Sequence, residues 1–129
     1  MIHLVTGGSG SGKSAYAEQC ILDFGGTRRV YIATMQPFGA EGQARIARHR
    51  KMRAAKQFST IECYTNLKEV ELEPGSDVLL ECMSNLTANE IFDPSGAGKA
   101  RAEEEILAGV SRLAHQARNL VLVTNEIFS

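Results

Sequence analysis

The sequence of 129 residues predicts a single α/β domain in which a mainly parallel sheet is flanked by helices. Short apolar runs alternate along the chain with longer segments of helical period, which is the pattern of successive strand–helix–strand units. Three of the short runs are almost entirely apolar, as expected for strands that are covered on both faces. A chain of this length buries roughly two thirds of its unfolded surface, which is enough for one hydrophobic core.

The expected elements alternate in order along the chain, separated by glycine and proline breaks such as Gly25-Gly26 and Pro74-Gly75. The expected strands are Ile2–Thr6, Arg29–Thr34, Phe58–Glu62, Val78–Glu81 and Leu120–Thr124. The expected helices are Lys13–Phe24, Ala40–Ala55, Ser84–Phe92 and Lys99–Ala117. Open α/β sheets bind ligands at the carboxyl ends of their strands, so the residues that follow these strands are candidates for a site.

The composition narrows the class of partners and the compartment. The net charge is −1, so the protein as a whole does not favour nucleic acid or another polyanion. Three cysteines without a C-x-x-C pair favour reduced thiols and a cytoplasmic location over a disulfide framework or a zinc site. No apolar run approaches the length of a membrane span, and the chain begins with a strand pattern rather than a signal peptide.

Residues 7–14 match the phosphate-binding pattern G-x-x-x-x-G-K-[ST], with a strand predicted before them and a helix after them. Glycines allow successive backbone N–H groups to point into one concavity, and the helix start adds a partial positive charge there. Lys13 is predicted to reach the terminal phosphates, and the Ser14 hydroxyl to bind Mg²⁺. The ligand class is a nucleoside triphosphate, and the predicted phosphate-binding residues are Gly7, Gly8, Ser9, Gly10, Ser11, Gly12, Lys13 and Ser14.

A basic helix is the second informative segment, because no acidic residue occurs between Glu41 and Glu62. On a helix Arg45, His49 and Arg53 lie along one face, where guanidinium groups can bind phosphate oxygens. The imidazole of His49 is a candidate nucleophile, because histidine can form covalent intermediates. A solvated basic helix with an incidental histidine is the alternative, and a nucleic-acid-binding helix is a third interpretation.

Carboxylates lie at the carboxyl ends of three predicted strands: Glu62 and Glu81 are the last residues of their strands, and Glu126 comes shortly after the last strand. A P-loop enzyme needs an acidic side chain near its Mg²⁺, commonly at the end of an apolar strand. Glu81 fits this best, because the residues before it are all apolar. The spacing leaves open whether Glu81 is a metal ligand or contacts a base.

Taken together, these motifs resemble the bifunctional adenosylcobinamide kinase/adenosylcobinamide-phosphate guanylyltransferase family. The resemblance runs in family order over nearly the whole chain, and the R-I-x-x-H-R-x-x-R pattern from Arg45 to Arg53, after Ile32-Ala33-Thr34, is its most specific part. The other matching stretches are Leu4–Gly8, Ser11–Ser14, Tyr31–Thr34, Thr60–Glu62, Leu79–Cys82, Asn89 and Val123–Glu126.

The resemblance implies a P-loop, RecA-like sheet in a homo-oligomeric enzyme of cobalamin biosynthesis. It implies phosphorylation of the corrinoid adenosylcobinamide with ATP or GTP, then transfer of GMP from GTP through a guanylylated histidine, here His49. It also implies a nucleotide site that includes Ala33, Thr34, Arg50, Lys51, Met52, Arg53, Glu62 and Glu81.

The chain departs from the family pattern at Ala54, where proline is usual, and at Phe58, where tryptophan is common. The family continues beyond Asn125-Glu126 with a glycine-rich loop, further helices and a closing strand, so a C-terminally shortened form of one domain over residues 1–129 is expected. Two alternatives stay open: a catalytically impaired nucleotide-binding fragment, and a P-loop kinase of another small metabolite.

Overall fold

The structure, a computed structural model, describes residues 2–7, 12–36 and 39–125. Every pair of neighbouring strands in its single sheet runs parallel, in the order β1-β5-β4-β2-β3. The strands are β1 (Ile2–Gly7), β2 (Arg28–Ala33), β3 (Phe58–Glu62), β4 (Ser76–Glu81) and β5 (Asn119–Asn125). The predicted α/β fold with a parallel sheet is therefore confirmed.

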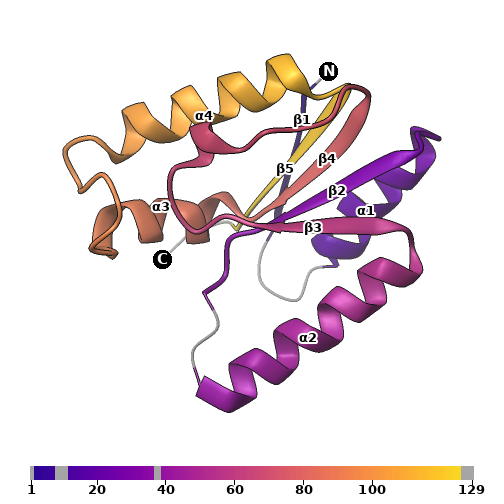
Figure 1. The fold of residues 1–129 in the computed structure, drawn as a ribbon, viewed down its shortest axis with the longest axis horizontal. Coiled ribbons are helices and arrows are strands. Elements are labelled where there is room, and N and C mark those ends of the chain that lie inside the picture. Colours follow the sequence, from indigo (N-terminus) through magenta and orange to yellow (C-terminus); the bar gives the residue numbers. More distant parts are fainter. Residues whose placement is uncertain (1, 8–11, 37–38, 126–129) are drawn as a thin grey trace.

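Helices cover both faces of the sheet, as Figure 1 shows. α1 (Lys13–Asp23) and α2 (Gly39–Ala55) lie on one side. α3 (Met83–Phe92) and α4 (Ala102–Gln116) lie on the other, together with the short 3₁₀ helix η1 (Leu67–Glu69). The molecule thus has three layers, and each layer boundary contains a hydrophobic cluster.

The alternation of strand side chains explains why the central strands read as continuous apolar runs. In β4, Leu79 packs into the cluster under α1, whereas Val78 and Leu80 pack into the cluster under α3 and α4. All three side chains have no exposed surface, because the strand is covered on both faces. At the sheet edge, by contrast, Leu4 of β1 is 63% exposed.

Two local differences from the sequence predictions have structural causes. α4 begins at Ala102 rather than Lys99, because Gly98 has a φ of +85° and residues 99–101 form a turn closed by hydrogen bonds to the Gly98 carbonyl. η1 was not expected. It packs against α4 where a Cβ on Gly109 would lie 2.7 Å from Leu67 Cβ, so glycine permits this close approach.

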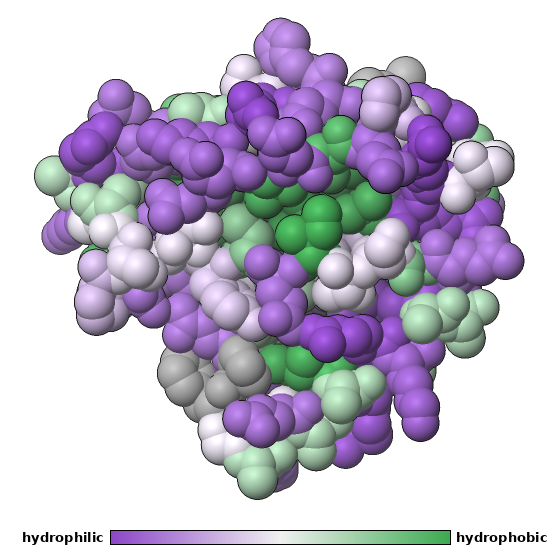
Figure 2. All heavy atoms as spheres, viewed as in Figure 1, coloured by the Kyte–Doolittle hydropathy of each residue, from purple (hydrophilic) through white to green (hydrophobic). Residues whose placement is uncertain are grey.

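The surface seen in Figure 2 is mainly hydrophilic, and the hydrophobic side chains visible there gather in the middle of the face. This distribution agrees with cores that lie between the layers rather than on the outer faces of the helices. No helix within the described residues combines the length and apolar character needed to cross a membrane.

The parallel sheet brings the carboxyl ends of all five strands to one edge. β5 lies between β1 and β4, and α1 packs across both β5 and β4. The first turn of α1 therefore comes to lie at the end of β4, although β1, which leads into that helix, is not a neighbour of β4.

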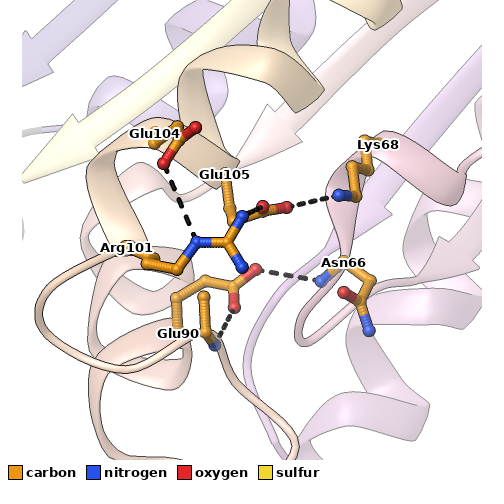
Figure 3. A network of polar contacts seen from close by, with 7 residues as sticks. Asn66, Lys68, Glu90, Arg101, Glu104 and Glu105 are labelled. Atoms are coloured by element: carbon orange, nitrogen blue, oxygen red, sulfur yellow. Dashed lines mark hydrogen bonds and ion pairs between the residues drawn. The ribbon is translucent and has the colours of Figure 1, made fainter.

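A buried carboxylate ties the loops on the opposite face together (Figure 3). Glu90 of α3 is 2% exposed and accepts hydrogen bonds from the backbone N–H groups of Asn66 and Ala97, both at 2.9 Å. Beside it, Glu105 of α4 forms ion pairs with Lys68 at 2.7 Å and with Arg101 at 2.8 Å. These contacts fix η1 and the loop after α3 relative to the two helices.

Replacement of Glu90 tests this role. Glu90→Ala removes the acceptor of two backbone N–H groups, so the free energy of unfolding should fall by about 2 kcal/mol in urea titrations. Glu90→Gln keeps one acceptor oxygen and should show a smaller loss. Glu103→Ala, on the exposed surface of α4, is the matched control and should leave the midpoint unchanged. Equal midpoints for Glu90→Ala and Glu103→Ala would contradict the assignment.

Candidate functional site

The start of α1 provides the described part of the predicted phosphate loop. Gly7 ends β1, and Gly12 precedes the helix with a φ of +81°, a conformation that favours glycine. Lys13 and Ser14 occupy the first turn of α1. The predicted residues Gly8, Ser9, Gly10 and Ser11 lie outside the described residues.

Ser14 and Glu81 meet at this helix start. The Ser14 hydroxyl donates a hydrogen bond of 2.7 Å to Glu81 Oε2, so two oxygen groups from distant parts of the chain converge. Hydroxyl and carboxylate oxygens are ligands that Mg²⁺ accepts, with phosphate oxygens and water completing its shell. Among the described residues no group of three or more His, Cys, Asp or Glu side chains gathers, so a cation here would depend on a ligand such as phosphate.

A cleft of about 210 Å³ joins this helix start to α2. Lys13 and Glu81 line it from one side, and the face of α2 that carries Arg45, His49 and Arg53 lines it from the other. An adjoining cavity of about 210 Å³ is lined by Ser14, His49 and Arg53. The two phosphate-binding patterns of the sequence therefore face the same space, and that space is rich in cationic side chains.

Arg53 attaches α2 to the sheet. Within the described segment Gly39–Ala55, Arg53 is the only buried side chain, and its guanidinium carbon lies 3.6 Å from the centroid of the Tyr31 ring. Cations above an aromatic face are attracted by the ring quadrupole, most strongly where water is excluded. Burial, and then the charge of Glu81, raise the pKa of Tyr31 well above its ordinary value, so its hydroxyl stays protonated.

Thr34 forms hydrogen bonds with other residues of the protein through both its hydroxyl and its carbonyl group. Its buried hydroxyl accepts a 2.8 Å hydrogen bond from the Cys82 N–H and lies 3.0 Å from the Glu81 carbonyl oxygen, to which it can donate. The Asn89 side-chain amide donates to the Thr34 carbonyl oxygen at 2.8 Å. Thr34 lines the cleft, as does Ala33, and its contacts fix the backbone that presents Glu81.

Other predicted site residues lie farther along α2 and β3. Arg50 is exposed and forms an ion pair with Glu62, which lines the cleft. Lys51 is exposed and is not among the cleft-lining residues. Met52 is 64% exposed and lines the adjoining cavity beside Ser14. The structure thus brings together His49, Lys13, Arg53 and Glu81, and places Arg50 and Lys51 outside both cavities.

Comparison with known proteins decides the family. The sequence model of the cobinamide kinase / cobinamide phosphate guanyltransferase family matches residues 3–129. The chain belongs to this family. The resemblance predicted from the motifs is therefore confirmed, and the fold is that of a P-loop NTPase-like domain.

Three relatives in this family are named for adenosylcobalamin biosynthesis. The chain is 35% identical to the bifunctional adenosylcobalamin biosynthesis protein CobU of Escherichia coli, with 98% of this chain and 76% of that protein aligned. The CobU protein of Salmonella typhimurium is 36% identical with the same coverage. The bifunctional adenosylcobalamin biosynthesis protein CobP of Pseudomonas aeruginosa is 33% identical, over 98% of this chain and 72% of that protein.

Six described residues that line the cleft were not among the predicted site residues: Tyr31, Met35, Ile46, Tyr64, Cys82 and Asn85. Tyr31 reads as a core residue, because it lies inside an apolar strand. A usable signal exists, since Tyr31 and Ala33 alternate on one face of β2 and Ala33 was already a candidate. Tyr64 and Asn85 follow β3 and β4 at the carboxyl edge of the sheet, which is where ligand contacts are expected.

Thr34→Val tests whether the threonine holds the site together. Valine has nearly the same shape but removes the hydroxyl oxygen to which the buried Cys82 N–H donates, which should lower the free energy of unfolding by about 1 to 3 kcal/mol. Thr34→Ser keeps the hydroxyl and is the matched control. Urea unfolding followed by circular dichroism measures both. A Thr34→Val protein as stable as the serine variant would show that the hydroxyl is not needed by the fold.

Proposed function

We propose that this protein phosphorylates adenosylcobinamide with ATP or GTP, and transfers GMP from GTP to adenosylcobinamide phosphate through a guanylylated His49. The observation that carries the proposal is that His49 and Lys13 line one cleft of about 210 Å³. A kinase alone needs the phosphate loop but has no need of a histidine nucleophile on an arginine-bearing helix face. The family's description names both a cobinamide kinase and a cobinamide phosphate guanyltransferase, and the relatives are named as bifunctional proteins of adenosylcobalamin biosynthesis, which supports the proposal.

The phosphoryl transfer uses the α1 side of the cleft. Lys13 lies against the terminal phosphates of the nucleotide and stabilises negative charge that develops on the transferred group. Ser14 and Glu81 fit Mg²⁺, because their oxygens already lie 2.7 Å apart at the phosphate loop. When bound there, Mg²⁺ neutralises charge on the phosphate oxygens. Thr34 keeps Glu81 in place through the backbone of residues 81 and 82.

The guanylyl transfer uses the α2 side. A lone pair of the neutral His49 imidazole attacks the α-phosphorus of GTP, and pyrophosphate leaves with the electrons of the broken P–O bond. The acceptor phosphate oxygen then attacks the same phosphorus, the diphosphate bond forms, and the electron pair of the N–P bond returns to the imidazole. Arg53 lies one turn of α2 from His49, where its guanidinium can bind the phosphate oxygens during both steps.

Substitutions of His49 and Lys13 test the two halves separately. With α-labelled GTP, the wild-type chain should acquire acid-labile label, and His49→Ala should abolish it. His115→Ala, which changes the histidine of α4, is the control and should label normally. Lys13→Ala should reduce phosphorylation of adenosylcobinamide by roughly a hundredfold or more. Label that resists acid or survives His49→Ala would refute the histidyl intermediate. Tight GTP binding without label or phosphorylation would indicate a nucleotide-binding module instead.

The Tyr31–Arg53 contact gives a second test. Tyr31→Leu removes the aromatic face that holds Arg53 and α2, so labelling of His49 should slow by about tenfold or more. Tyr31→Phe keeps the ring and should label within about twofold of wild type. Rates are read from single-turnover labelling, with thermal melting as a check that each variant is folded. Equal loss in the leucine and phenylalanine variants would mean that the hydroxyl, not the ring, matters.

A further inference from the structure

A second, larger cavity lies beside the nucleotide cleft. Its volume is about 880 Å³, against about 210 Å³ for the cleft, and Glu62 and Tyr64 at the end of β3 line both. Ligand sites for organic molecules span roughly 300 to 1,000 Å³. The cavity also lies at the carboxyl edge of the parallel sheet, which is where bound ligands in such sheets are found. The cavity and the cleft are therefore neighbours that share part of their lining.

The walls of this cavity are held by the buried carboxylate of Figure 3. Asn66 and Glu69, on one wall, belong to the segment whose backbone donates to Glu90. Asp93 and Ser95, on another wall, precede Ala97, whose N–H donates to the same carboxylate. Gln36, which follows β2, donates a 2.7 Å hydrogen bond to Asp93 across the cavity rim. The walls come from different parts of the chain, yet they are tied to one another.

The charge of this cavity contrasts with that of the cleft. Among its described lining residues none is Lys or Arg, and the carboxylates are Glu62, Glu69, Glu71 and Asp93. Arg50 and Arg112, from outside the lining, pair with Glu62 and Glu71. Hydrogen bonds from Ser95 and then Gln36 hold the pKa of Asp93 below its usual range, so it is ionised at neutral pH. Such a surface disfavours a second polyanion and accepts hydrogen bonds from amide, hydroxyl or cationic groups.

We propose that this cavity binds the body of the acceptor: a bulky, uncharged or cationic molecule rich in amide donors, with its reactive end directed past Glu62 and Tyr64 into the cleft. This inference rests on the proposed function, in which the acceptor is a corrinoid. A corrinoid carries peripheral carboxamides and a cationic cobalt, which suit carboxylate acceptors. Ile61 and Val70 add apolar contact area for the flat faces of such a ring.

The charge of the η1 wall gives the test. Glu69→Lys/Glu71→Lys reverses two exposed carboxylates that line the cavity, and Glu103→Lys/Glu104→Lys makes the same change of charge on α4 as the matched control. Binding of adenosylcobinamide to the full chain is measured by equilibrium dialysis, read from the visible absorbance of the corrinoid, with a non-hydrolysable ATP analogue present. The dissociation constant should rise by about tenfold for the cavity pair and stay within about twofold for the control.

The rate at which GTP labels His49 in the absence of an acceptor is measured on the same proteins. It should be the same in the wild type and in both double variants. If the wild-type chain binds adenosylcobinamide and the Glu69→Lys/Glu71→Lys variant binds it with the same dissociation constant, the assignment of this cavity is wrong, while the proposed function stands. If the wild-type chain is labelled on His49 but does not bind adenosylcobinamide, the corrinoid is not the acceptor, and this part of both proposals is wrong. Loss of label in the cavity pair would place the two carboxylates in nucleotide binding and would also contradict the inference.

Discussion

The contact between the Arg53 guanidinium and the Tyr31 ring determines where α2 lies, and the rest of the site depends on it. α2 is polar around its circumference, so hydrophobic burial cannot dock it against the sheet in the ordinary way. Its one buried side chain is instead a cation, held at 3.6 Å over an aromatic ring. Because His49 lies one turn before Arg53, the same contact brings the imidazole to the cleft.

Burial of Arg53 is unfavourable in the free protein, but it prepares the guanidinium group to bind phosphate. Among the residues that the structure describes, its Nε has no hydrogen-bond partner, and an unsatisfied buried donor is destabilising. A phosphate oxygen in the cleft would supply the acceptor. The ring holds the guanidinium in place before the ligand arrives, so less side-chain entropy is lost when phosphate binds. The Ser14–Glu81 hydrogen bond acts in a similar way at the other side of the cleft, where it keeps two oxygen groups together.

The sequence predicted the features of the structure that depend on local residue patterns. Every predicted helix and strand occurs within a few residues of its expected bounds, because strand alternation, glycine breaks and helical period are local properties. The basic face of α2 could be predicted for the same reason. The burial of Arg53 could not, since charged side chains are normally solvated and its partner lies 22 positions earlier, in an apolar strand. The structural roles of Glu90 and Thr34 could not be predicted either, although Thr34 was expected in the nucleotide site, because these roles come from backbone groups that only the folded chain brings near.

The central claim is that one nucleotide contacts both sides of the cleft. A crystal structure of the full chain with Mg²⁺ and a non-hydrolysable GTP analogue tests it most directly. The account predicts that Arg53 and Lys13 both contact the triphosphate, that Ser14 turns from Glu81 to the metal, and that a nitrogen of His49 faces the α-phosphorus. A triphosphate bound at Lys13 with its α-phosphorus beyond contact of His49 and Arg53 would contradict it.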